Sequence, residues 1–329
     1  MSGESSTKTQ GKENLKPIDI RALRVGSHLE FPLYVQGRGD RRFKLLQGPN
    51  HSFSQNVFNR IQNDYEGTAY IYPEHVEPFE EAAKSSLNAT FADPLKKPEE
   101  KVDALMHHAD NKLQDALDDP DPYELPDFQQ VSDFPEYVRT LLEGENDTNS
   151  LVLGVMGKNE SLSTHSLQVC MYGMMIVNEL SHIQFTDKDK EEIALGFISH
   201  DIGKVHIDKG ILNKPCKPNS MEWRIIRQIP ERSVSILTEW GITGDRAIEI
   251  VRNHREHYDG NGYPSQLSGD DIPILARICS IADDFSSLTT RKAYRPALSP
   301  YDALWIMRVD NEGYYDTDLL SLFVDILVG

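Results

Sequence analysis

The chain has 329 residues, of which 39% are hydrophobic and 26% are charged, a composition typical of a globular protein with roughly two domains. Its formal net charge of −18 leaves no basic excess to neutralise phosphates, which excludes general nucleic-acid binding. No apolar run approaches membrane-spanning length, and the polar N-terminus lacks the apolar core of a signal peptide. We therefore expect a cytoplasmic protein without a membrane partner, whose three widely spaced cysteines are reduced thiols.

The first part of the chain predicts a small β-rich domain. Residues 1–17 are polar and predict a disordered tail. Over residues 18–84 a glycine-rich hairpin signal, "QGRGD", stands among strand-like segments, which are "HLEFPLYV", "RRFKLLQ" and "TAYIYP". Residues 85–149 are charged and rich in proline, and "PEEKVDALMHHADNKLQDAL" within them predicts a helix. We expect a regulatory domain over 18–84 and a helical spacer over 85–149.

From residue 150 to residue 329 the hydrophobic pattern becomes helical and indicates an all-α domain. The fold class is therefore expected to be α+β, with the helical domain at the C-terminus. Helices are expected over 163–180, 191–201, 245–260 and 273–288. Each brings an imidazole or a carboxylate to an inward-facing position, and these residues are His165, His200 with Asp201, His254 and Asp283.

The segment "GFISHDIGKVHIDKGIL" places His200, Asp201 and Lys204 among residues that are expected to be buried. An unpaired charge is costly there, so these residues either pair with each other as structure or hold an ion. A single buried histidine usually has its hydrogen-bond partners within the core, whereas ligand-type side chains that converge from four helices favour a metal site. Imidazoles and carboxylates bind iron, manganese or zinc, and two bridged ions generate hydroxide at neutral pH. This chemistry predicts hydrolysis of a phosphate ester.

The segment "HREHYDGNGYPSQLSGDDIPILARICSIADD" resembles the signature of the HD-GYP family, the helical phosphodiesterases of bacterial cyclic-di-GMP signalling. Upstream, "SHDIGKVHI" is similar to the HD motif of the family, and Gly262, Tyr263 and Pro264 match its GYP loop. The resemblance covers residue 150 to the C-terminus. It implies an HD-GYP domain that hydrolyses cyclic-di-GMP or a related guanine nucleotide, with a GYP loop that docks signalling proteins of the GGDEF type.

The resemblance also implies roles for single residues. It implies two transition-metal ions, iron or alternatively manganese, bridged by Asp201, and a ligand set of His165, His200, Asp201, His254 and Asp283. Lys204 matches a lysine that assists at the reacting phosphate and, with Asp201, is expected to be catalytic. Lys292 and Arg295 match two basic residues that bind the phosphates of the nucleotide, although by themselves they also fit a solvated basic turn.

Several positions depart from the family pattern. Arg255 stands where a second adjacent histidine is expected, and Ile229 takes the place of another ligand histidine. Ser286 replaces the second aspartate of the "ADxxDAL" pattern, and Glu160 lies five residues before His165 where the family glutamate lies four before. These changes remove two imidazoles, so they argue against a third ion and weaken the support for the second.

The departures leave the activity open. The Arg255 guanidinium repels a metal but can bind a phosphate oxygen, so we expect a protein that binds the nucleotide better than it cleaves it. His206 and His257 either replace the missing ligands or are ordinary exposed histidines. The alternatives to a weak phosphodiesterase are a catalytically degenerate binding or docking module and an HD phosphohydrolase that acts on another nucleotide.

Overall fold

In the computed structural model the chain folds into two compact units, residues 1–92 and 93–329. The described residues are 15–37, 42–118, 133–144, 162–212, 214, 216–291 and 295–328. None of the helices in these ranges combines the length and the apolar character that crossing a membrane requires.

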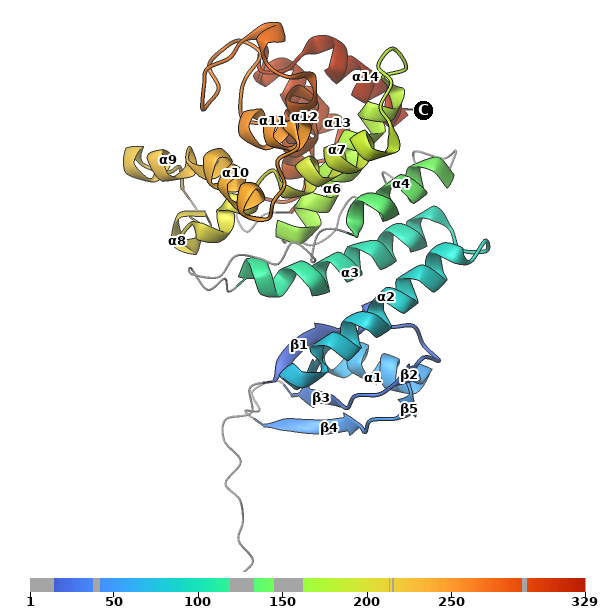
Figure 1. Ribbon diagram of the computed structural model, residues 1–329. Helices are drawn as coiled ribbons and strands as arrows, with labels where there is room; N and C mark the ends of the chain where they lie inside the picture. Colours follow the sequence, from blue (N-terminus) through green and yellow to red (C-terminus); the bar gives the residue numbers. More distant parts are fainter. Residues whose placement is uncertain are drawn as a thin grey trace, which may run out of the picture. The chain divides into compact units, whose positions relative to one another are not determined.

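The first unit contains a four-stranded antiparallel sheet with the strand order β1-β6-β3-β4, of which β1, β3 and β4 are labelled in Figure 1. Its strands are β1 (Lys16–Asp19), β3 (Leu33–Gln36), β4 (Phe43–Gln47) and β6 (Thr68–Ile71). A separate antiparallel pair consists of β2 (His28–Leu29) and β5 (His51–Ser52). The unit also has two short 3₁₀ turns (Ile20–Ala22 and Pro73–His75) and two helices, α1 (Gln55–Asp64) and α2 (Val76–Ala92). Buried and less buried side chains alternate along β3, because successive side chains of a strand point to opposite faces of the sheet. Leu33 and Val35 therefore point into the core of this unit.

Two features of this unit differ from the sequence prediction, and a third agrees with it. Lys16 and Pro17, which were expected in a disordered tail, pair with Ile71 and Tyr70 as the start of β1. The strand expected over 28–35 is divided between two sheets, since Pro32 lacks the N–H that a continuous ladder needs. The predicted hairpin between β3 and β4 agrees with their antiparallel pairing, although residues 38–41 lie outside the described part of the chain.

The second unit is helical (Figure 1). Its longer helices are α3 (Pro98–Asp118), α4 (Phe134–Gly144), α6 (Leu162–Glu179), α7 (Asp187–Ser199), α10 (Ile229–Glu239), α11 (Asp245–Asn253), α12 (Ile274–Thr289) and α14 (Thr317–Val328). The shorter ones are α8 (Lys209–Leu212), α9 (Ser220–Ile226), α13 (Pro300–Trp305), a π-helical turn (Ile306–Asp310) and 3₁₀ turns at Ile202–His206 and Gly269–Asp271. The α+β fold with a helical C-terminal domain is confirmed.

Helix α6 packs against both α7 and α12, and α11 packs against α7 and α12, so these four helices form the centre of the unit. Edge-to-face aromatic contacts join α6, α12 and α14, since the Phe285 ring centroid lies 5.2 Å from Tyr172 and 5.0 Å from Phe323. The helix expected over 245–260 ends earlier, at Asn253, so His254 is the C-cap of α11 and the residues after it form a loop. The tightly packed α6, α7 and α12 carry the predicted site residues His165, His200 and Asp283.

Candidate metal centre

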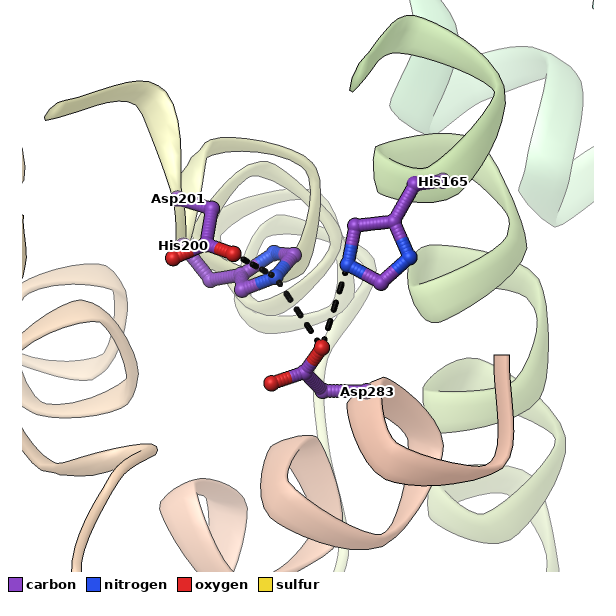
Figure 2. A group of neighbouring side chains, drawn as sticks. All are labelled: His165, His200, Asp201 and Asp283. Atoms are coloured by element: carbon purple, nitrogen blue, oxygen red, sulfur yellow. Dashed lines mark ion pairs between the residues drawn. The ribbon is translucent and has the colours of Figure 1, made fainter. Parts of the chain in front are cut away.

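Three helices bring four predicted ligands together (Figure 2). His165 lies in the first turn of α6, and Asp283 lies in the buried face of α12. His200 caps the C-terminus of α7, and Asp201 immediately precedes the 3₁₀ turn that follows. Gly203 lets this turn pack closely on α10, because a Cβ there would lie only 2.6 Å from the Ile229 carbonyl oxygen.

One ligand atom from each of these four residues lies within 4.8 Å of the others. Asp283 Oδ1 lies 3.0 Å from His165 Nε2 and 3.9 Å from His200 Nε2. Asp201 Oδ2 lies 3.4 Å from His200 Nε2 (Figure 2). Two imidazoles and two carboxylates at these separations form the mixed nitrogen and oxygen set that suits iron, manganese or zinc.

Hydrogen bonds to the opposite ring nitrogens orient the histidines. Nδ1 of His200 bonds to the Phe197 carbonyl oxygen at 2.8 Å, and Nδ1 of His254 bonds to that of Val251 at 2.9 Å. These bonds place the proton on Nδ1 and leave the lone pair on Nε2. Nε2 of His200 and of His254 is buried and has no hydrogen-bond partner among the described residues. A buried acceptor without a partner is costly, so these atoms fit a metal ion.

A hydroxyl orients the third histidine. His165 Nδ1 lies 2.9 Å from Ser286 Oγ, which in turn donates to Gln168 Oε1 at 2.7 Å. Since Ser286 donates its own proton to Gln168, its lone pair accepts the proton of His165 Nδ1. Ser286, which the sequence marked only as a departure from the family, therefore orients the predicted ligand His165.

The electrostatics keep the ligands in the protonation states that metal binding needs. Burial lowers the pKa of His165 to about 4 and also lowers the pKa of His254. Burial by itself would raise the pKa of both carboxyl groups, but nearby cations outweigh it. Lys204 and Arg255 hold the pKa of Asp201 well below its ordinary value, and Arg255 lowers that of Asp283.

Two cations lie against these carboxylates. Lys204 Nζ lies 2.6 Å from Asp201 Oδ2. Arg255 contacts both carboxylates, with Nη2 3.1 Å from Asp201 Oδ2 and Nη1 3.0 Å from Asp283 Oδ2. About a quarter of each cationic side chain is exposed, 25% for Lys204 and 27% for Arg255, while the carboxylates are buried. Each cation therefore pairs with a buried carboxylate and is itself partly exposed to solvent.

The other predicted site residues are less closely associated with this cluster. His254 is next to it, with Nε2 3.6 Å from Asp201 Oδ1. The Arg295 guanidinium donates to the carbonyl oxygens of Ser287 and Leu288 near the C-terminus of α12, where cations are favoured. Lys292 and Glu160 lie outside the described residues.

The two additional histidines are not members of the four-residue group. The carbonyl oxygen of His206 accepts from Arg232 Nη1 at 3.0 Å. The His257 ring stacks on Tyr314 with a centroid separation of 4.1 Å. Their suggested role as replacement ligands stays a prediction.

The GYP loop is tied to the same segment that carries His254 and Arg255. The buried carboxylate of Glu256 accepts hydrogen bonds from the backbone N–H groups of Ser265 and Leu267, at 2.6 and 3.1 Å. The Tyr263 N–H donates to the Arg255 carbonyl oxygen at 3.0 Å. Sequence reasoning missed Glu256, although a carboxylate next to a dense loop motif was a usable signal for a backbone anchor.

Replacing Glu256 by glutamine is expected to loosen the GYP loop. The amide keeps one acceptor oxygen but presents N–H groups to a backbone donor, which costs about 1–3 kcal/mol. Thermal unfolding and hydrogen exchange of residues 262–267 measure this effect. Glu239→Gln, a change at an exposed residue of α10, is the matched control. Equal unfolding temperatures and equal exchange in the two variants would show that Glu256 does not anchor the loop.

Comparison with known proteins shows what the helical unit is similar to. Residues 166–319 match the HD domain family. The chain is 34% identical over 152 residues to a 3'3'-cGAMP-specific phosphodiesterase of Vibrio cholerae, covering 44% of this chain and 28% of that protein. It is 28% identical over 160 residues to a cyclic di-GMP phosphodiesterase of Pseudomonas aeruginosa, covering 49% of this chain and 38% of that protein. The chain thus spans well under half of the length of these relatives.

One solved structure has a similar fold. It is an HDG"Y"P protein from Bdellovibrio bacteriovorus, with a TM-score of 0.70 and 16% sequence identity. The match covers 96% of this chain and all of the other chain. At this identity the similarity establishes the HD-GYP fold and leaves the chemistry of the site to be argued from its residues.

Proposed function

We propose that this HD domain is a metal-dependent phosphodiesterase that hydrolyses a cyclic dinucleotide, with weak turnover. The observation that carries the proposal is the buried cluster of His165, His200, Asp201 and Asp283, with the unpartnered Nε2 of His200 aimed into it. A bound transition metal would act there as a Lewis acid and lower the pKa of a water molecule. Iron, with manganese as the alternative, suits this set of nitrogen and oxygen donors.

The residues around the cluster have distinct roles in the proposal. His165, His200, Asp201 and Asp283 hold the metal, and His254 with a shared Asp201 would be the donors of any second ion of the kind that the family resemblance implies. Lys204, which is one quarter exposed, binds a phosphate oxygen of the substrate at the mouth of the site. That Arg295 and Lys292 bind the phosphates of the nucleotide stays a prediction. The cytoplasmic location of the protein also stays a prediction.

Cyclic-di-GMP or a related guanine dinucleotide is the proposed substrate. The support is that similar proteins bear the names of cyclic di-GMP and 3'3'-cGAMP phosphodiesterases. The GYP loop, Gly262 to Pro264, is the proposed docking surface for a GGDEF-type signalling protein. Gly262 is required by its close packing, since a Cβ there would lie 2.2 Å from the His257 backbone nitrogen.

A binding module without turnover is the second candidate, and the Arg255 contacts favour it. The guanidinium occupies one oxygen of both Asp201 and Asp283, which reduces the donors available to a second ion. Such a protein retains affinity for the dinucleotide because its site remains cationic at the mouth. An HD phosphohydrolase acting on a different nucleotide is a third reading, and the retained GYP loop argues against it.

A binding and turnover assay separates these functions. The full chain is loaded with Fe²⁺ without oxygen, or with Mn²⁺, and incubated with cyclic-di-GMP, 3'3'-cGAMP and the linear dinucleotide. We expect tight binding of a cyclic dinucleotide and slow, metal-dependent cleavage. Fast cleavage would reject weak turnover, binding without cleavage would establish the second candidate, and failure to bind either cyclic dinucleotide would contradict the proposal.

A further inference from the structure

The two oxygens of each carboxylate in the cluster face different partners. Asp283 directs Oδ1 to His165 Nε2 at 3.0 Å and Oδ2 to Arg255 Nη1 at 3.0 Å. Asp201 directs Oδ2 to Arg255 Nη2 at 3.1 Å and to Lys204 Nζ at 2.6 Å. One planar guanidinium therefore joins the two carboxylates, one nitrogen to each. A permanent positive charge thus already lies between the two carboxylates that are proposed to hold the metal.

Few donors remain for a second ion. His254 Nε2 and Asp201 Oδ1 are buried, lie 3.6 Å apart and have no hydrogen-bond partner within the described residues. Ile229, where the family pattern has a histidine, is buried and offers no lone pair. Within the described residues, a group of three or more metal-binding side chains is found only at the four-residue cluster. Two donors beside a fixed positive charge make a weak metal site.

The net charge of the cluster also disfavours a second metal ion. Lys204 and Arg255 together neutralise Asp201 and Asp283, and an imidazole that binds a metal ion is uncharged. A first divalent ion leaves the pocket with two positive charges, and a second would leave four. In a largely buried site such an excess is strongly unfavourable unless the arginine side chain leaves.

We infer that Arg255 is a built-in substitute for the second cation, so that the site binds one transition-metal ion per chain. This inference rests on the proposed metal dependence and narrows the sequence-based expectation of two ions. A guanidinium stays charged at any physiological pH, so the substitution is permanent. It supplies positive charge next to the cluster but no water of lowered pKa. The weak turnover that we propose then follows from a cation that cannot activate a nucleophile.

Metal stoichiometry tests the inference without measuring activity. The full chain is stripped with a chelator and dialysed against Mn²⁺, and bound metal is counted by elemental analysis. We expect one Mn²⁺ in the wild-type chain and close to two in Arg255→His, which removes the guanidinium and adds an imidazole. Arg252→Gln is the matched control, because Arg252 is a partly exposed arginine three residues away that pairs with Glu231. This variant should bind one Mn²⁺, as the wild type does.

Electron paramagnetic resonance of the Mn²⁺-loaded proteins gives a second readout. Isolated Mn²⁺ is expected in the wild type and a coupled pair in Arg255→His. Arg255→Gln, which removes the charge without adding a ligand, should bind a second ion more weakly than Arg255→His but more tightly than the wild type. Unfolding temperatures confirm that each variant is folded.

Failure of the one-ion inference can be distinguished from failure of the proposed metal dependence. Two tightly bound ions in the wild-type chain would overturn the inference and leave the proposed function intact. One ion in a folded Arg255→His variant would also overturn it. A wild-type chain that binds no Mn²⁺, Fe²⁺ or Zn²⁺ would overturn the proposed metal dependence itself.

Discussion

Replacing Asp201 by alanine is expected to release the bound metal and to lower phosphodiesterase activity by several orders of magnitude. Asp201 is fully buried. Its carboxylate oxygens lie 3.4 Å from His200 Nε2 and 3.6 Å from His254 Nε2, so one carboxylate faces both imidazoles, and alanine offers no oxygen in its place. Loss of a metal removes several kcal/mol of transition-state stabilisation, and each 1.4 kcal/mol is roughly a factor of ten in rate. Elemental analysis and an assay of cyclic-dinucleotide hydrolysis measure the two effects.

Asp201→Ala also leaves Lys204 and Arg255 with one carboxylate fewer, which is expected to destabilise the fold by about 3–5 kcal/mol. Asp201→Asn keeps the size of the side chain and is the milder second variant. Asp318→Asn, at an exposed aspartate in the first turn of α14, controls for the loss of one negative charge. A folded Asp201→Ala protein with full metal content would show that the ion is held elsewhere.

Histidine at both position 229 and position 255 is expected to accelerate hydrolysis by about two orders of magnitude or more, because a second metal contributes several kcal/mol to catalysis. The change removes the guanidinium from Asp201 and Asp283 and adds two imidazoles where the family pattern has ligands. Initial rates with cyclic-di-GMP at saturating Mn²⁺ or Fe²⁺ measure the gain.

The two single variants divide the effect between the added ligands and the lost charge. Ile229→Leu combined with Arg255→Lys serves as the control, because it alters both side chains without supplying a ligand. If the double histidine variant folds and binds a second ion but cleaves no faster, the missing ligands are not the cause of weak turnover.

The convergence of the cluster was predictable because inward-facing positions of a helix repeat with a regular spacing. His165, His200 and Asp283 each lie on the apolar side of a helix that must pack on the others, so their side chains had to meet. The meeting of these side chains therefore followed from hydrophobic periodicity, whereas their role as metal ligands was implied by the family resemblance and stays a prediction. The α+β fold class followed from the change between strand-like and helical patterns.

The contacts of the two arginines Arg255 and Arg295 were beyond the reach of sequence patterns. Arg255 follows the end of α11, where the helical period no longer fixes the direction of a side chain, and the sequence assigned it to a phosphate oxygen. In the structure it contacts two carboxylates from different segments of the chain. Arg295 likewise binds carbonyl oxygens near the end of α12, because a long flexible side chain takes the nearest available acceptors.

Three consecutive residues after α11 have three separate tasks. His254 directs Nε2 to the cluster, Arg255 joins two carboxylates, and Glu256 holds the backbone of the GYP loop. Consecutive Cα atoms are about 3.8 Å apart, so the position of each of these three side chains is constrained by those of the other two. The insertion or deletion of a single residue here would misplace ligand, cation and anchor together. Variation in related chains is therefore expected as substitution at these positions, with the length of the segment unchanged.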